Sequence, residues 1–348
     1  MKKTILSLVV LCFTMAAQAQ PGEPVSATLQ VGDEVTMFYG SGALKAALDA
    51  APQSGGVITL TAGLFDWNAN WKITKSVSIY GAGWETDDAN GTYLSRFGSS
   101  GNNWGNIVIE GTSEQPLENV TIEGIRMWSY ATPLQISYAK NVTISRSWLG
   151  GLRINGKSEN ITIRQCSFYE NNNTTSIESS EQVVGLTIKN CLISRVSNIN
   201  STSSVLIDHC ILNPNNNGYQ HSGTPIYTNN IVTGSSPFPN GTTAKYNLFL
   251  NATSLDASIG AEGSWLKNDV ITPLFSDTND NSVSYTETRT FELTDAAKTK
   301  YIGTDGTEVG LYGGEYPWTK KPSSPRVKGI ELGVSGTTLN VTYDAETR

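Results

Sequence analysis

Four stretches with one shared pattern decide the fold: VTISRSWL (Val142–Leu149), ITIRQCSF (Ile161–Phe168), LTIKNCLI (Leu186–Ile193) and VLIDHCIL (Val205–Leu212). The first three begin with alternating apolar and polar residues, as a strand with one buried face does, and the fourth keeps the apolar residues at the same positions. Two residues then turn a corner, and the alternation resumes. A unit of roughly twenty residues cannot bury its apolar face alone, so neighbouring units must stack and share a core. The repeat predicts an all-β fold, a single right-handed parallel β-helix (solenoid).

One position of the repeat holds three cysteines. This column runs through Ile125, Ser147, Cys166, Cys191, Cys210, Asn230 and Asn247. Stacked strands lie about 4.8 Å apart, so equivalent residues should form a ladder along the axis. Three is an odd number for disulfides in an exported chain. We therefore interpret the cysteines as small, buried, reduced hydrophobic side chains, not as bridges or metal ligands.

The position after this column should face outward if the alternation is strict. In the early coils it holds Arg126, Trp148 and Ser167. In the later coils it holds four large aliphatic residues: Leu192, Ile211, Ile231 and Leu248. Monomeric soluble proteins seldom leave such a stripe bare. We expect the chain to cover it with either residues 255–318 or two strands at 327–344, and to leave the early coils open.

The N-terminus has the signature of a secretory signal peptide over residues 1–19. Lys2 and Lys3 precede a short apolar run, and Ala17-Gln18-Ala19 is a cleavage signal with small residues. The apolar run is too short to span a bilayer. Cys12 leaves a lipoprotein open as an alternative. The mature chain is expected to be exported, to the periplasm, the outer surface or the medium.

The remaining chain divides into a β-helix domain and a tail. The domain, residues 20–318, comprises a capping helix within 40–52, coils over about 55–250 and a closing segment at 255–318. The helix is predicted because Leu44, Ala47 and Leu48 share one face and Pro52 stops it. Residues 319–348 are predicted to form a linker and a two-strand C-terminal tail.

Composition excludes some classes of function. The formal net charge is −7 and only 16% of residues are charged, with no long basic run. Nucleic acid is therefore not an expected partner. No further apolar run reaches membrane-spanning length, so no membrane span is expected and the mature chain should be a soluble monomer.

Several stretches resemble a known family. They are GGVITLTAGLF (Gly55–Phe65), ITKSVSIYGAGW (Ile73–Trp84), TFELTDAAKTKYIGTDG (Thr290–Gly306) and VGLYGG (Val309–Gly314). With the Asn-Cys and His-Cys corners they resemble the pectate-lyase-like superfamily of parallel β-helices, in particular its exported bacterial members. The resemblance implies a polysaccharide lyase or a glycoside hydrolase. Calcium is implied only by the lyases, and the chain shows no complete catalytic motif and no predicted metal site.

The outward columns beside the corner supply candidate ligand-binding residues. They are Arg126, Arg146, Trp148, Arg164, Gln165, Lys189, Asn190, Asp208 and His209. Arg164 and Lys189 fall on neighbouring coils and could neutralise a uronate carboxylate, either one serving as base. The alternative is a solvated corner in which Asp208 pairs with Lys189. Exposed tryptophans could stack on sugar rings.

The sequence thus predicts a protein that binds or processes polysaccharide or oligosaccharide. The alternative is a non-catalytic surface or structural protein that binds glycan, in the manner of an adhesin. Whether the chain is an enzyme is left open by the sequence.

Overall fold

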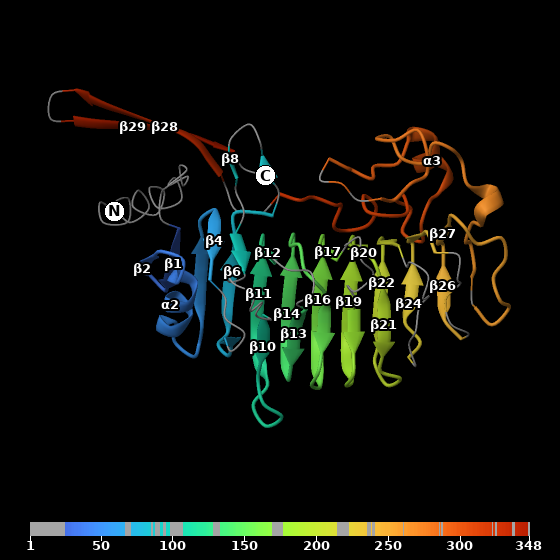
Figure 1. Cartoon of the computed structure of the whole chain (residues 1–348), viewed down its shortest axis with the longest axis horizontal. Coiled ribbons are helices and arrows are strands. Elements are labelled where there is room, and N and C mark those ends of the chain that lie inside the picture. Colours follow the sequence, from blue (N-terminus) through green and yellow to red (C-terminus); the bar gives the residue numbers. More distant parts are fainter. Residues whose placement is uncertain are drawn as a thin grey trace.

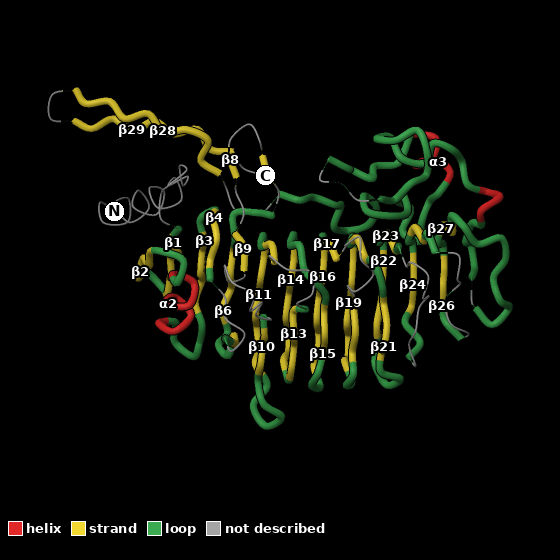
Figure 2. Tube along the Cα trace, in the orientation of Figure 1, coloured by secondary structure: helices red, strands yellow, loops and turns green. Residues whose placement is uncertain are grey.

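The computed structural model describes residues 25–66, 71–84, 86–87, 91–92, 95–97, 107–127, 133–168, 177–213, 223–234, 238, 241–259, 261–284, 286, 288–321, 323, 326–335 and 338–346. Within these residues the chain forms an all-β parallel β-helix of about seven turns (Figure 1). The predicted fold class is therefore confirmed. Strands of successive coils lie side by side along the long axis, and helices occupy little of the chain (Figure 2).

Three sheets enclose the core, and each coil contributes strands to them. Sheet A consists, in spatial order, of β2 (Glu34–Tyr39), β1 (Ser26–Val31), β3 (Gly56–Leu60), β6 (Val77–Tyr80), β11 (Leu117–Glu123), β14 (Ala139–Ser145), β16 (Ser158–Arg164), β19 (Val183–Lys189), β22 (Val205–Asp208), β24 (Ile226–Thr228) and β26 (Thr243–Lys245). Its strands are parallel except β1, which pairs antiparallel with both β2 and β3.

Sheet B begins directly after the corner. One part holds β4 (Gly63–Phe65), β9 (Ser95–Phe97) and β12 (Arg126–Met127), and the other holds β17 (Ser167–Phe168), β20 (Leu192–Ile193), β23 (Ile211–Leu212), β25 (Ile231–Val232) and β27 (Leu248–Phe249). Trp148 joins the two parts because it bridges to Arg126 on one side and to Ser167 on the other.

Sheet C closes the cross-section. It contains β5 (Lys72–Ile73), β10 (Val108–Glu110), β13 (Leu134–Ser137), β15 (Leu152–Ile154), β18 (Ile177–Ser179) and β21 (Val196–Ile199). A small hairpin, β7 (Thr86–Asp87) with β8 (Gly91–Thr92), lies outside the three sheets.

The register of sheet A stacks equivalent repeat residues on one another. Ile144 pairs with Ile163, Ile163 with Ile188, and Ile188 with Ile207, and all four side chains are fully buried. The threonine that precedes each isoleucine in the first three strands points outward and is partly exposed. The period-two reading of the repeat therefore gives the correct inward and outward faces.

The three cysteines are free and buried, as predicted. Their role is larger than that of small hydrophobic fillers. The Cys191 backbone N–H donates to the Cys210 Sγ at 3.4 Å, and the Cys210 N–H donates to Asn230 Oδ1 at 2.8 Å. The Asn230 N–H in turn donates to Asn247 Oδ1 at 3.0 Å. We call Cys166, Cys191, Cys210, Asn230 and Asn247 the inner column. From Cys191 onward its side chains accept hydrogen bonds from backbone N–H groups at the corner, which have no partner within the sheets.

The N-terminal end is closed by helix α2 (Ala43–Ala50), which confirms the predicted capping helix. Ala43, Leu44, Ala47 and Leu48 face the core and are buried. The other end is closed by one further coil. There the Tyr246 N–H donates to Glu262 O, and Trp265 N–H donates to Asn247 O, both at 2.9 Å.

The closing segment covers the aliphatic stripe formed by Leu192, Ile211, Ile231 and Leu248. All four side chains have 0% exposure and pack in a second core with Leu274, Phe275, Leu293, Tyr301 and Leu311. The segment includes η1 (Lys267–Asp269) and α3 (Asp295–Lys300), and it lies above the later coils in Figure 1. Of the two predicted covers, residues 255–318 are the correct one.

The chain then returns toward the early coils. In Figure 1 it runs along the upper side of the solenoid and continues into the hairpin of β28 (Arg326–Ser335) and β29 (Thr338–Glu346). We call residues 303–323, which lie along the corner between sheets A and B, the strap. No helix in the described part of the chain is long and apolar enough to cross a membrane.

Candidate functional site

Five residues at the corner between sheets A and B form what we call the anchor column. They are Arg146, Gln165, Asn190, His209 and Asn229, with φ between 46° and 58°. This left-handed conformation directs the chain from one sheet into the next. Asparagine tolerates it, whereas it is strained by about 1–3 kcal/mol for bulkier residues. The column therefore holds polar side chains in line on the outer side of the corner.

The strap is hydrogen-bonded to this column coil by coil. Gln165 Nε2 donates to Pro317 O at 2.6 Å. Asn190 Nδ2 donates to Leu311 O at 2.9 Å and to Gly313 O at 2.7 Å. Both side chains are buried, so these bonds satisfy donors that water does not reach. Two predicted ligand residues therefore bind the protein's own backbone.

Asn229 forms the next anchor, by a reciprocal pair of bonds. Its Nδ2 donates to Thr304 Oγ1 at 3.0 Å, and its Oδ1 accepts from the Thr304 backbone N–H at 2.8 Å. The backbone carbonyl of Asn229 also accepts from the Gly310 N–H at 2.8 Å. Asn229 is not among the nine predicted ligand residues, although it continues the column of Asn190 and His209.

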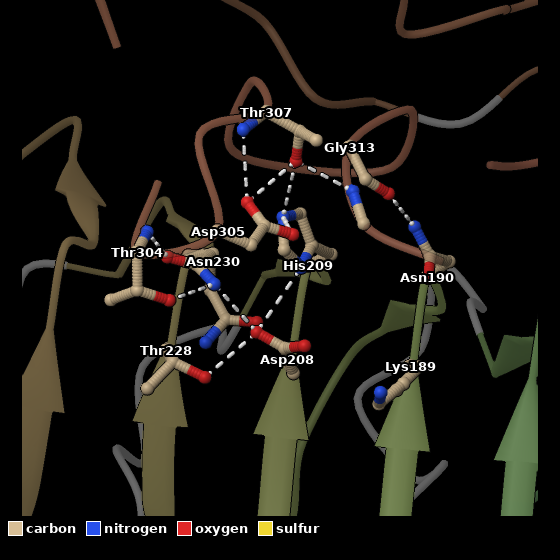
Figure 3. Close-up of polar contacts among 12 residues, drawn as sticks. Lys189, Asn190, Asp208, His209, Thr228, Asn230, Thr304, Asp305, Thr307 and Gly313 are labelled. Carbon is tan, nitrogen blue, oxygen red and sulfur yellow. Dashed lines mark hydrogen bonds and ion pairs between the residues drawn. The ribbon is translucent and has the colours of Figure 1, made fainter. Parts of the chain in front are cut away.

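His209 is the centre of the polar network shown in Figure 3. Its Nδ1 lies 3.1 Å from Asp208 Oδ1, at ion-pair distance though off the direction of a good hydrogen bond. Its Nε2 lies 3.2 Å from Thr307 Oγ1 and 3.5 Å from Asp305 Oδ2. The histidine, only 1% exposed, thus joins an acid of the solenoid to an acid of the strap.

The order Asp208, His209, Thr307 resembles a nucleophilic triad, but the hydrogen bond between Thr307 and His209 has the opposite direction. Thr307 Oγ1 donates to Asp305 Oδ1 at 2.7 Å and accepts from the Gly314 N–H at 2.7 Å. Its only proton is committed to Asp305, so Thr307 accepts from the histidine. A nucleophilic hydroxyl must instead donate to the imidazole. The network is suited to holding the strap.

Two glycines allow the strap to approach His209. A Cβ on Gly313 would lie 1.7 Å from the Glu308 backbone oxygen and 2.5 Å from His209 Cδ2, and one on Gly314 would lie 2.9 Å from His209 Nδ1. Side chains therefore do not fit between the strap and the imidazole ring. The glycine pair of the VGLYGG motif is explained by the close approach of Gly313 to the Glu308 carbonyl, by the φ of 74° at Gly314 and by the contact of both with His209.

Asp208 is an ionised member of the network. Burial, the largest single influence, acts to raise its pKa, but the contacts with His209, Thr228 and Asn229 together outweigh burial. Thr228 Oγ1 donates to Asp208 Oδ1 at 2.7 Å, and Asn229 Nδ2 donates at 2.9 Å. The net result is that the pKa of Asp208 is held below its ordinary value.

The strap is fixed at its far end by Glu123. This buried carboxylate accepts from both the backbone N–H and the hydroxyl of Ser323 at 2.5 Å. Arg146 Nη1 donates to it at 3.0 Å, and so does Ser145 Oγ. Burial acts to raise the pKa of Glu123, but the bonds from Ser323 and the charge of Arg146 lower it overall. Predicted site residue Arg146 thus supports a strap anchor.

The basic pair predicted to bind a uronate lies beneath the strap. The Arg164 guanidinium carbon lies 4.4 Å from the ring centroid of Tyr316, and Lys189 Nζ lies 5.8 Å from it. Lys189 Nζ also lies 3.6 Å from Glu315 Oε2. The two cations are on neighbouring coils, as predicted, and their partners come from the strap.

A second cluster lies where the strap leaves the corner. The Arg126 guanidinium carbon is 3.6 Å from the ring centroid of Trp148, and both residues are partly exposed. Trp148 meets Trp84 edge to face at 5.7 Å, and Trp84 meets Trp318 at 6.4 Å. Lys320 Nζ lies 5.7 Å from the Trp84 ring. We call these five residues the aromatic–cation cluster.

The nine predicted residues therefore fall into two groups. Arg126 and Trp148 belong to the aromatic–cation cluster, and the other seven lie at or beside the strap anchors. Among the described residues, no group of three or more His, Cys, Asp or Glu side chains is placed to hold a metal ion.

Comparison with protein-family models, with curated proteins and with solved structures found no match to this chain.

Proposed function

We propose that this chain is an exported β-helix protein of the pectate-lyase-like kind that binds an acidic polysaccharide at the aromatic–cation cluster. The N-terminal signature of residues 1–19 supports export, and the motifs at 55–84 and 290–314 support the family resemblance. The observation that carries the proposed site is the stacking of Arg126 on Trp148 at 3.6 Å.

An arginine stacked on an indole is held flat before a ligand arrives. Its planar guanidinium can then offer two parallel N–H donors to a carboxylate, at a lower entropic cost than a freely rotating side chain. Lys320 on the Trp84 ring adds a second cation. Cations beside indole rings suit an acidic glycan, because a carboxylate pairs with a cation while a sugar ring stacks on an aromatic face.

The strap-covered pair of Arg164 and Lys189 is the rival site. Both cations contact Tyr316, and Lys189 also lies 3.6 Å from Glu315, so a glycan carboxylate would compete there with partners from the strap. At the aromatic–cation cluster Arg126 and Trp148 are partly exposed, and the stacking at 3.6 Å already orients the guanidinium. A carboxylate bonded by a charged donor contributes about 1.5–3 kcal/mol, or roughly 10- to 100-fold in affinity.

Affinity electrophoresis in gels containing polyuronate or a neutral glucan tests both sites. We expect retention by polyuronate, a loss of about tenfold or more for Arg126→Ala, and partial rescue by Arg126→Lys. Arg153→Ala is the matched control, because Arg153 is an exposed arginine of sheet C paired with Glu178. Retention lost only in the Arg164→Ala/Lys189→Ala variant would move the site beneath the strap.

The same incubations distinguish a binding protein from an enzyme. Release of unsaturated ends would identify a lyase, and release of reducing ends alone would identify a hydrolase. Equal migration in gels with and without every acidic polymer would contradict the proposed function.

A further inference from the structure

The outer edge of β2 is where sheet A ends at the N-terminal side. β2 pairs with β1 along its whole length, from Glu34 opposite Val31 to Tyr39 opposite Ser26, without a bulge. Among the described residues no strand pairs with its other edge. The opposite end of the solenoid differs, because the coil around Glu262 and Trp265 continues the backbone bonds there.

The face of β2 that looks away from the core carries exposed apolar side chains. Val35 is 40% exposed and Tyr39 is 66% exposed, with Met37 between them on the same face. Phe38 points the other way and packs against the core. Two strands further in, Val57 continues this outward face and is 38% exposed. This end of sheet A therefore has an uncharged surface beside an open edge.

Natural sheets normally protect such an edge with Lys, Pro, a bulge or a covering segment. The run from Asp33 to Tyr39, DEVTMFY, contains neither Lys nor Pro. Its two charges, Asp33 and Glu34, both precede the apolar part. The edge thus keeps its hydrogen-bonding capacity together with residues that pair well across strands.

We propose that β2 pairs antiparallel with β2 of a second copy of this chain, which joins two sheets A into one. A two-fold axis perpendicular to the sheet at Met37 places Met37 opposite its own copy. The same axis places Val35 opposite Tyr39 on both sides, an aromatic with a β-branched residue. Glu34 then faces Gly40, so the register sets no acid directly against another acid.

This self-complementary register is the reason for assigning a second copy as the occupant. An interface built on one six-residue strand is small, so the association is weak, in the micromolar range or above. The molecular mass in solution distinguishes the monomer expected from the sequence from the dimer proposed here. In sedimentation equilibrium we expect a mass twice that of the chain at about 100 µM and dissociation at about 1 µM.

Substitutions at the edge locate the interface. Met37→Lys places two ammonium groups opposite each other at the axis and should abolish the dimer. Val57→Lys is the matched control, because it adds the same charge to the same face but away from the edge. Thermal unfolding of both variants tells loss of pairing from loss of fold.

Cysteine cross-linking provides a positive test. Under mild oxidation Met37→Cys should give a covalent dimer, since directly opposite Cβ atoms lie about 4.5–5.5 Å apart. The Val57→Cys control should not, because five strand spacings of about 4.8 Å would separate its two copies. Cys166, Cys191 and Cys210 are fully buried and do not interfere, and the experiment uses the chain without residues 1–19, which lacks Cys12. A single-chain mass at every concentration, or equal cross-linking of both variants, would overturn the proposal.

Discussion

The two halves of sheet B use the same outward position for opposite purposes. In the later coils it holds Leu192, Ile211, Ile231 and Leu248, and the closing segment buries all of them. In the early coils it holds Arg126 and Trp148, which stack on each other and remain partly exposed. One repeat position can therefore build a second core or remain partly exposed, depending on whether another part of the chain folds over it.

The largest effect should come from truncating the covered stripe. Leu192→Ala and Ile231→Ala remove fully buried methyl groups, so each should lower the free energy of unfolding by about 2–5 kcal/mol. Ile163→Ala, in the main core, should cost the same. Thr162→Ala, on the outward face of sheet A, should cost under about 1 kcal/mol. Denaturant unfolding measures the free energy of unfolding of all four variants. A stripe variant that loses as little as Thr162→Ala would contradict the assignment of the stripe to a second core.

Next in size is the loss of one strap anchor. Asn190→Ala removes two buried bonds to the strap and should cost about 1–3 kcal/mol more than Asn198→Ala. The two asparagines have φ of 50° and 51°, so the strain of alanine cancels between them, and Asn198 is exposed.

Limited proteolysis provides a second comparison of Asn190→Ala with Asn198→Ala. Only Asn190→Ala should speed cleavage within residues 303–323, because only this variant loosens the strap. Equal cleavage of the two variants would mean that the strap is held without the anchor column.

Acidification should weaken both ends of the strap. The pKa values of Glu123 and Asp208 are lowered in the folded chain, so each carboxylate stabilises the fold at pH above its ordinary value, 4.5 or 3.8. That stability is lost as pH falls through the lowered folded values. Unfolding midpoints at pH 7, 5, 4 and 3 should fall less steeply below pH 5 for Glu123→Gln than for the parent chain. The exposed Glu118→Gln should keep the parent slope.

The smallest effect concerns the inner column, which runs beneath both halves of sheet B. Cys191→Ser keeps an acceptor for the Cys166 N–H and should cost under about 1 kcal/mol. Cys191→Ala leaves that N–H unpaired and should cost about 1–3 kcal/mol. If the cysteines were only apolar fillers, serine would be the worse substitution. Alkylation after denaturation should also label three thiols in the chain without residues 1–19.

The repeat and its covered stripe were predictable because they depend on neighbours in sequence. Alternation over a few residues determines which face is buried, and the step to the next coil is roughly twenty residues. The aliphatic residues at the position of Leu192 and Ile211 likewise predict a covering segment. Two segments could have supplied that cover, residues 255–318 and the strands at 327–344.

The strap contacts were not predictable in this way. Gln165 and Pro317 are 152 positions apart, and Asn190 and Leu311 are 121 apart. Polar residues on an outward column are equally consistent with a ligand and with a distant part of the same chain. Only the three-dimensional path shows that the strap contacts Gln165 and Asn190, and that Arg126 lies beyond most of its anchors.

The strap also imposes an order on folding. A chain that emerges N-terminus first completes the coil of Leu192 well before residues 270–311 are available to cover it, and Glu123 waits longest for its partner, Ser323. During that interval the stacked coils carry a bare aliphatic row, and Glu123 has Ser145 and Arg146 but not Ser323 as partners. Residues late in the chain thus complete the environment of residues in the early coils, and a truncation that removes Ser323 would alter the surroundings of Glu123.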